Sequence, residues 1–262
     1  MLDSGLPAFG LNDYAGLLGR LREHGYALQP VSAMPECTPG TAYLRHDVDI
    51  HLGLVEEMAR AEADAGARAT YYVCLTQPYN VFSHQGRATL AALREMGHEI
   101  GLHYDLETYP AGPDERRAHL GWELASLERA AGAPVTTLCM HQPARGEPDP
   151  FRELSGLLHP HDPRLQEGLM YVSESCRAWR DDALLRCFGP GRPERLLLNT
   201  HPESWLDGSI EDRLEYARRV LLPGATGEAG RFVAGTVCDV WGTHPATFAH
   251  DERERRLAAL PV

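Results

Sequence analysis

The chain has 262 residues, of which 43% are hydrophobic and 24% are charged, and its formal net charge is −12. This composition is typical of a globular protein that buries a core, and the length suits a single α/β domain, which we expect over residues 1–262. The negative charge, with no run of Lys or Arg to offset it, excludes the phosphate backbone of a nucleic acid as a partner.

The first ten residues carry no recognisable targeting signal, because no basic segment is followed by an apolar run. Nowhere does the sequence contain the roughly 18 consecutive apolar residues that would span a bilayer. We therefore expect a cytoplasmic protein that binds no membrane.

Strand-like and helix-like segments alternate along the chain. A first helix is expected to start at Asn12 or Asp13, because either side chain can cap it, and to end at Gly25. Apolar residues at helical spacing predict further helices around residues 54–65, 90–93, 120–131 and 210–221. Apolar, β-rich runs predict strands at residues 41–45, 69–75, 99–103, 135–140, 169–173, 195–199 and 231–237.

This alternation predicts an α/β fold in which the strands form a mainly parallel sheet. We expect an irregular (β/α) barrel of about seven mainly parallel strands, with an N-terminal helical cap. In barrels of parallel strands the functional residues lie where strands end and loops begin. Four of the predicted strands end in polar residues of the kind that carry out chemistry.

The first of these strand ends carries two aspartates, in the sequence Arg45-His46-Asp47-Val48-Asp49. The alternation of a strand places Asp47 and Asp49 on the same side, at the interior or the mouth of the barrel. Two carboxylates so close together can both stay ionised when a divalent cation lies beside them. One would then bind the metal and the other would take a proton from water. The structural alternative is a strand end capped by aspartate, with Arg45 as its ion-pair partner.

The other three strand ends carry histidine. A neutral imidazole at His103 is a good ligand for Zn²⁺ or a similar metal. His141 and His201 each follow an apolar strand and precede, within two residues, a proline. Histidines at equivalent strand ends favour one shared site over separate structural roles. His98 lies at the opposite end of its strand, and we interpret it as structural.

Two loop segments are interpreted separately. His159 and His161 lie in a Pro-rich stretch and are most simply surface or loop residues. The segment 173–180 follows another strand end and is a candidate substrate contact. Trp179 in this segment either stacks against a sugar or belongs to the core.

Together these motifs resemble the polysaccharide deacetylase family, the chitooligosaccharide deacetylase homology domain of carbohydrate esterase family 4. The resemblance covers about residues 40–205 and rests on His46-Asp47-Val48-Asp49, Ala69-Thr70-Tyr71-Tyr72-Val73, Gly97-His98-Glu99-Ile100-Gly101-Leu102-His103, His141-Gln142-Pro143 and Asn199-Thr200-His201. It implies that Asp47 is the catalytic base, that Asp49 and His103 are metal ligands, and that His201 is the general acid.

One position departs from the family pattern, in which the second ligand histidine lies four residues after the first. This chain has Glu107 there. We prefer His141 as the third metal ligand, because it stands where the family has an arginine, which could not bind a metal. Glu107 and His201 are the alternatives, together with the absence of any bound metal.

The resulting hypothesis is a metal-dependent hydrolase of the deacetylase type. It would remove an N-acyl group, most simply N-acetyl, from a soluble amino-sugar, nucleoside or natural-product intermediate, so its partner is a small acylated molecule. The expected cofactor is a divalent metal, with Zn²⁺ as the first choice and Fe, Co, Ni or Mn as alternatives. Such an ion lowers the pKa of its water to about 7.

Three other interpretations stay open. A metal-independent amidohydrolase or deformylase on the same fold is favoured by the loss of the second ligand histidine at Glu107. A non-haem Fe(II) oxygenase could use His103, Asp105 and His201, although such triads typically lie on all-β jelly rolls. A non-catalytic carbohydrate-binding relative would have kept the barrel and lost the site.

Overall fold

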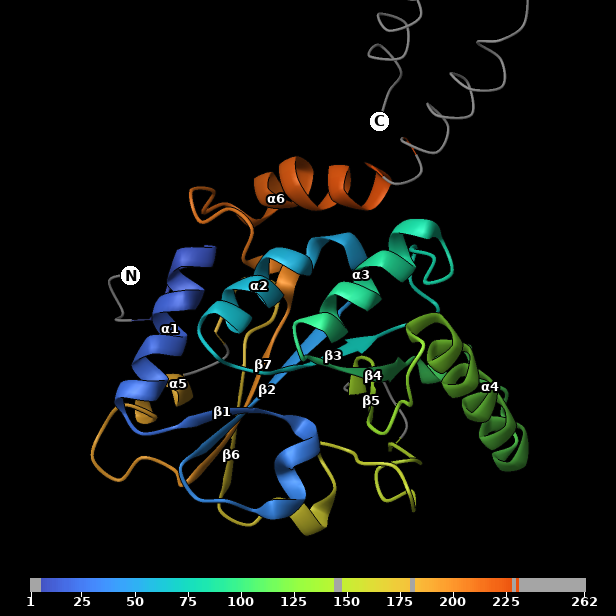
Figure 1. The fold of residues 1–262 in the computed structure, drawn as a ribbon, viewed down its shortest axis with the longest axis horizontal. Helices are drawn as coiled ribbons and strands as arrows, with labels where there is room; N and C mark the ends of the chain where they lie inside the picture. Colours follow the sequence, from blue (N-terminus) through green and yellow to red (C-terminus); the bar gives the residue numbers. More distant parts are fainter. Residues whose placement is uncertain (1–5, 144–147, 180–181, 228–229, 231–262) are drawn as a thin grey trace, which may run out of the picture.

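The computed structural model describes residues 6–143, 148–179, 182–227 and 230. Within them, one seven-stranded parallel sheet is curled into a half-barrel, with helices around its outer face (Figure 1). The strands are β1 (Ala27–Pro30), β2 (Thr41–Val48), β3 (Thr70–Val73), β4 (Glu99–Tyr104), β5 (Leu138–Met140), β6 (Leu169–Ser173) and β7 (Arg195–Thr200). The α-helices are α1 (Leu11–Glu23), α2 (Glu56–Asp64), α3 (His84–Glu95), α4 (Pro113–Ala131), α5 (Ala183–Arg186) and α6 (Arg213–Tyr216).

Shorter helical turns lie mainly at the ends of strands. They are the 3-10 turns η1 (Val31–Glu36), η2 (Leu52–Leu54), η3 (Leu106–Thr108), η5 (Pro163–Leu165) and η6 (Pro202–Ser204), and the π-helical turn η7 (Ala217–Leu221). Among the described residues, no helix combines the length and the apolar character needed to span a bilayer.

β2 lies at the centre of the sheet, whose strand order is β5-β4-β3-β2-β7-β6. One side of β2 pairs with β7 along most of its length, from Thr41 opposite Arg195 onward. Its other side pairs first with β1 and then with β3, beginning at Arg45 opposite Thr70. Since all these pairings are parallel, the carboxyl ends of the strands meet at one edge, as the sequence predicts.

The predicted α/β class and the alternation of elements are confirmed, with three differences. The cap predicted at Asn12 or Asp13 is wrong, because α1 begins one residue earlier and Gly10 is its N-cap residue, with no side-chain hydrogen bond. The short strand β1, which contains Gln29 and Pro30, was not predicted. The strand expected at residues 231–237 lies outside the described residues.

α1 is an outer helix rather than a lid over the carboxyl ends of the strands. It packs against α2 and β1, and successive helices from α1 to α4 follow one another around the sheet (Figure 1). Its buried face consists of Tyr14, Leu17, Leu18 and Leu21, the residues expected from their helical spacing.

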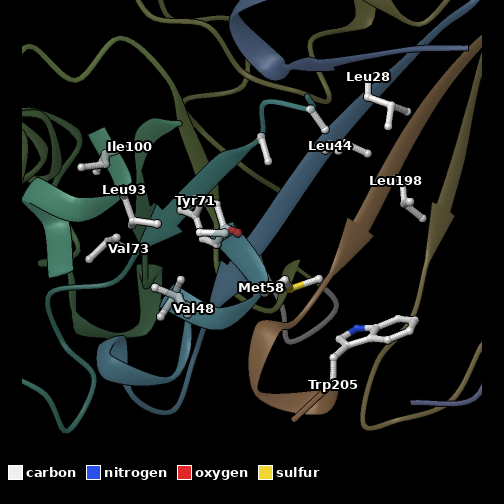
Figure 2. Packing of buried hydrophobic residues seen from close by; sticks show 14 of the residues in the cluster. Leu28, Leu44, Val48, Met58, Tyr71, Val73, Leu93, Ile100, Leu198 and Trp205 are labelled. Atoms are coloured by element: carbon white, nitrogen blue, oxygen red, sulfur yellow. The ribbon is translucent and has the colours of Figure 1, made fainter. Parts of the chain in front are cut away.

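Alternate residues of the strands belong to two separate apolar clusters. The larger cluster lies between the sheet and the helices and includes Leu44, Val48, Tyr71, Val73 and Leu198, which are labelled in Figure 2 together with Met58 of α2. The smaller cluster lies on the concave face and consists of Val31, Met34, Tyr43, Tyr72, Cys139 and Leu197. The period of two along each strand therefore separates the helix-covered core from the interior of the half-barrel.

Gly101 on β4 allows Tyr72 of β3 and Thr137 to pack directly against this strand. A Cβ atom at this position would lie 2.6 Å from Tyr72 Cε1 and 2.7 Å from Thr137 Oγ1. These distances are too short for carbon and oxygen atoms that are not bonded. A glycine is therefore needed here for close approach of the neighbouring strands rather than for its backbone flexibility.

A buried carboxylate joins α1, α2 and the outer face of β2. Glu62 accepts hydrogen bonds from Tyr14 at 2.5 Å and from Tyr71 at 2.7 Å, and lies 2.6 Å from His46 Nε2. Burial would raise the pKa of Glu62, but the neighbouring His46 outweighs this effect and holds the pKa below its usual value. The carboxylate is therefore ionised and fully paired.

His98 lies beside this network, and its contacts fit the structural interpretation. Its Nε2 donates to the carbonyl of Ala59 at 2.9 Å, and its Nδ1 accepts from the N–H of Ala69 at 3.2 Å. Both ring nitrogens are thus occupied by the backbone of elements on the outer side of the sheet.

We expect Glu62→Ala to lower the free energy of unfolding by about 3–5 kcal/mol, because it leaves His46 and two buried tyrosine hydroxyls without their acceptor. Urea denaturation measures the change. Glu57→Ala, on the exposed face of the same helix, is the matched control and should change stability by about 0.5 kcal/mol or less. Equal stability of the two variants would contradict the structural role of Glu62.

Candidate metal centre and cavity

The strand alternation brings the two predicted aspartates to the concave side of the sheet. Arg45, Asp47 and Asp49 all line one cavity of about 590 Å³, whereas His46 points the opposite way, toward Glu62. His103 of β4, His141 after β5 and His201 after β7 line the same cavity. The five residues proposed from sequence for the site therefore share one cavity at the carboxyl ends of the strands.

Three of these side chains form a compact group of donors. Asp49 Oδ1 lies 3.5 Å from His103 Nε2 and 3.3 Å from His141 Nδ1, and the two histidine nitrogens are 3.2 Å apart. One carboxylate oxygen and two imidazole nitrogens so close together are a donor set that Zn²⁺ and related ions accept. These three residues could hold a divalent metal.

The surroundings of the group fit a cation. His103 Nδ1 lies 3.0 Å from the carbonyl of Cys139, so Nδ1 carries the proton and the lone pair of Nε2 faces Asp49. Asp49 Oδ1 is buried and accepts no well-formed hydrogen bond, although His141 lies nearby. A buried carboxylate oxygen without a donor needs a positive partner. The residues present therefore fit the metal that the motifs imply.

Glu107 does not join this group. It lies in the exposed turn η3, beyond the end of β4. The donors that lie together in the described part of the chain are those of Asp49, His103 and His141.

Two residues that line the cavity, Gln142 and Cys176, and the next residue along the chain, Arg177, adopt unusual backbone conformations. Gln142, Cys176 and Arg177 have φ values of 44°, 53° and 57°, in the left-handed region that non-glycine residues rarely adopt. Gln142 directly follows His141, and the guanidinium of Arg177 donates to the carbonyls of Ser204 and Ile210 at 2.7 and 2.8 Å. Such strain commonly lies at functional sites and persists because the surrounding contacts hold it in place.

Asp47 is held by a buried arginine. Arg45 Nε and Nη2 each donate to one carboxylate oxygen of Asp47 at 2.8 Å, and Asn199 Nδ2 donates to Oδ2 at 3.2 Å. Burial would raise the pKa of Asp47, but the Arg45 guanidinium outweighs it and lowers the pKa well below its usual value. The ion pair expected from the structural interpretation is thus present, and it keeps Asp47 ionised.

His201 lies between two carboxylates. Its Nε2 is 3.7 Å from Asp49 Oδ2, and its Nδ1 is 3.3 Å from Oε1 of Glu174, which also accepts from the N–H of His201 at 2.6 Å. Burial would lower the pKa of His201, but Glu174 outweighs burial and raises the pKa well above its usual value. The histidine is therefore protonated at neutral pH and can donate a proton in the cavity.

Sequence reasoning missed Glu174 as the partner of His201. The residue follows β6 directly, so its position at a strand end was a signal of the same kind as those at Asp49 and His103. Its segment was singled out only as a candidate substrate contact. Trp179 in this segment packs against Phe9 and Trp205 and donates to the carbonyl of Pro7, which identifies it as the core residue of the two alternatives.

The surface position expected for His159 and His161 is wrong. His159 is 2% exposed and its Nε2 lies 2.9 Å from Asp149 Oδ2, while His161 Nε2 lies 3.0 Å from Arg45 Nη1. Both line the cavity. The reason is that their loop turns inward beside β5, where Leu158 bridges to Thr137, instead of running over the surface.

No family model matches the sequence, and no curated protein matches it either. Among solved structures, the chain is similar to the family 4 acetyl xylan esterase from Clostridium thermocellum in complex with a cobalt ion, with 14% identity, coverage of 71% of this chain and 84% of that chain, and a TM-score of 0.42. It is also similar to the Streptococcus pyogenes deacetylase PplD in complex with acetate, with 13% identity, coverage of 74% and 84%, and a TM-score of 0.43.

A third similar structure is a mutant of BA3943, described as a carbohydrate esterase family 4 pseudoenzyme with restored enzymatic activity. It shares 14% identity over 72% of this chain and 63% of that chain, with a TM-score of 0.37. The acetyl xylan esterase and BA3943 are both described as members of carbohydrate esterase family 4.

Proposed function

We propose that the chain is a metal-dependent hydrolase that removes an N-acyl group, most simply N-acetyl, from a soluble small molecule, and that residues 1–262 form one catalytic domain in the cytoplasm. The observation that supports this most is the placement of Asp47 and His201 beside the Asp49, His103 and His141 donors, with Asp47 3.8 Å from His103 and His201 3.7 Å from Asp49. Binding alone needs no such combination of base, acid and metal ligands.

In this proposal Asp49, His103 and His141 hold the metal. A bound divalent ion would lower the pKa of water and polarise the acyl carbonyl, with Zn²⁺ as the first choice and Fe, Co, Ni or Mn as alternatives. Asp47 accepts the proton of the attacking water, and Arg45 and Asn199 fix the direction of its carboxylate. His201 donates its proton to the departing amine, while Glu174 stabilises the protonated ring before that step.

The competing hypotheses are weakened to different degrees. Asp105, needed for the oxygenase triad, accepts the N–H of Glu107 at the start of η3 instead of joining the donor group, and the parallel α/β fold is not the jelly roll on which such triads usually lie. A metal-independent amidohydrolase or deformylase on this fold stays the second candidate, because it needs only Asp47 and His201.

We expect the protein to bind about one equivalent of Zn²⁺ or Co²⁺, and Asp49→Ala, His103→Ala or His141→Ala to weaken this binding severely, because each removes one of three donors. Elemental analysis after dialysis against the metal measures the content. Glu107→Ala is the control and should keep its metal. If the wild type binds no metal when supplied with it, the metal-independent amidohydrolase becomes the better account.

We expect Asp47→Asn to lower acyl hydrolysis by roughly 10²- to 10⁴-fold while the metal is retained, because the variant cannot accept a proton from water. Acetate release from a panel of N-acetylated amino sugars and nucleosides is the assay, with metal content measured on the same sample. Asp64→Asn, an exposed change on α2, should leave the rate unaltered. Full activity of Asp47→Asn would remove the base from this mechanism.

We expect Glu174→Gln to lower kcat about tenfold or more with little change in KM. The glutamine oxygen can still accept from the N–H of His201, so the backbone stays in place and only the negative charge beside the ring is lost. Steady-state acetate release separates the two constants. A rise in KM at constant kcat would instead assign Glu174 to substrate binding.

A further inference from the structure

The part of the cavity next to Asp47 is formed by hydrogen-bond donors. Arg45, which holds Asp47, also reaches His161 through Nη1 at 3.0 Å. Asn199, which donates to Asp47, also donates to the hydroxyl of Tyr171 at 3.3 Å. His161 and Tyr171 are therefore each linked to the proposed base through one side chain, and their rings meet edge to face at 5.0 Å.

The protonation of His161 follows from its partner. An arginine has only donors, so His161 Nε2 must accept from Arg45. Burial and then the Arg45 charge lower the pKa of His161 to about 3, so the ring is neutral and its remaining proton is on Nδ1. The side chain thus offers an N–H to whatever lies beside it in the cavity.

Tyr171 offers a second donor. Its hydroxyl oxygen accepts from Asn199, which leaves the hydroxyl proton available; the residue is 38% exposed and lines the cavity. Its ring adds an apolar surface next to this donor. A substrate that reaches Asp47 would therefore contact both an aromatic face and an O–H group.

Arg152 adds a positive charge to the lining of the cavity. It is exposed, lines the cavity, and makes no ion pair or hydrogen bond with the residues that the structure describes. Two acidic side chains that line the same cavity are already engaged, since Asp149 contacts His159 and Tyr104, and Asp47 is held by Arg45. In a protein with a net charge of −12, a guanidinium at the cavity that pairs with no acidic side chain among the described residues is an attractive site for an anion.

We propose that Arg152, His161 and Tyr171, here called the donor wall, bind an oxyanion carried by the substrate, so that the molecule deacylated is an N-acylated amino sugar bearing a carboxylate or a phosphate. The proposal rests on the hydrolase function proposed above for the acyl group, but the donor wall binds the anion independently of turnover. Carboxylate and phosphate oxygens both match a set that contains donors and a positive charge.

The test compares three probes by isothermal titration calorimetry with the zinc-reconstituted full chain: N-acetylglucosamine, N-acetylglucosamine 1-phosphate and N-acetylmuramic acid, which are neutral, phosphorylated and carboxylated. We expect one charged probe to bind about tenfold or more tightly than the neutral sugar, because hydrogen bonds to charged groups are the stronger ones. The probe that gains identifies the anion as phosphate or carboxylate.

Arg152→Gln should abolish this advantage without changing the affinity for the neutral sugar. Arg164→Gln is the matched control, because Arg164 lies in the same loop, is exposed, and is already paired with Asp162. The advantage should persist there. Equal affinity for all three probes, no measurable binding of any, or an advantage that survives Arg152→Gln, as it would if the anion bound the metal, would overturn the proposal.

Acetate release from the same three probes separates this proposal from the hydrolase function. If all three are hydrolysed at equal rates and bound equally, the hydrolase function stands and the donor wall does not bind an anion. If none is hydrolysed but Arg152→Gln removes the preference for the charged probe, the donor wall stands as an anion site and the hydrolysis of N-acetylated amino sugars is contradicted.

Discussion

The complete burial of β2 is the constraint on which the rest of the structure depends. This central strand carries Arg45, His46 and Asp47, and ionised side chains are stable in a protein interior only when they are paired. The period of two along the strand directs these side chains to opposite faces of the sheet. Outward, His46 meets Glu62, which fixes α1 and α2 on the sheet; inward, Arg45 pairs with Asp47. One strand thus determines both the helix packing and the electrostatics of the cavity.

The ion pair of Arg45 and Asp47 links the proposed base to the donor wall. The guanidinium of Arg45 uses two nitrogens for Asp47 and a third for His161. The same side chain that keeps the proposed base ionised therefore also fixes the tautomer of a residue in the donor wall. A change at Arg45 would alter both functions at once, whereas Arg152 lies outside this network and can be changed without disturbing Asp47.

Much of this arrangement could be predicted from sequence. Apolar runs correctly predicted six of the seven strands. Because parallel strands end at one edge of a sheet, the sequence also predicted that Asp49, His103 and His141 lie close together. Contacts that depend on the path of a loop could not be predicted in this way. His159 and His161 lie in a Pro-rich segment whose pattern gives no sign that it turns inward, and Trp179 is in the core because of Phe9 and Trp205, which are distant in sequence. Glu174 carried a signal, but only its neighbours reveal that it pairs with His201.

The histidine at position 141, where the family that the motifs resemble has an arginine, is understandable from the donors around it. An arginine has no atom that can bind a metal, whereas a histidine offers a ring nitrogen beside Asp49 and His103. Asp47 still has a positively charged partner, because Arg45 of the same strand pairs with it. The Arg45 guanidinium contacts both Asp47 and His161. His103, which approaches both Asp47 and Asp49, is left able to bind a metal. The departure from the family pattern at this position is therefore compatible with a working metal centre.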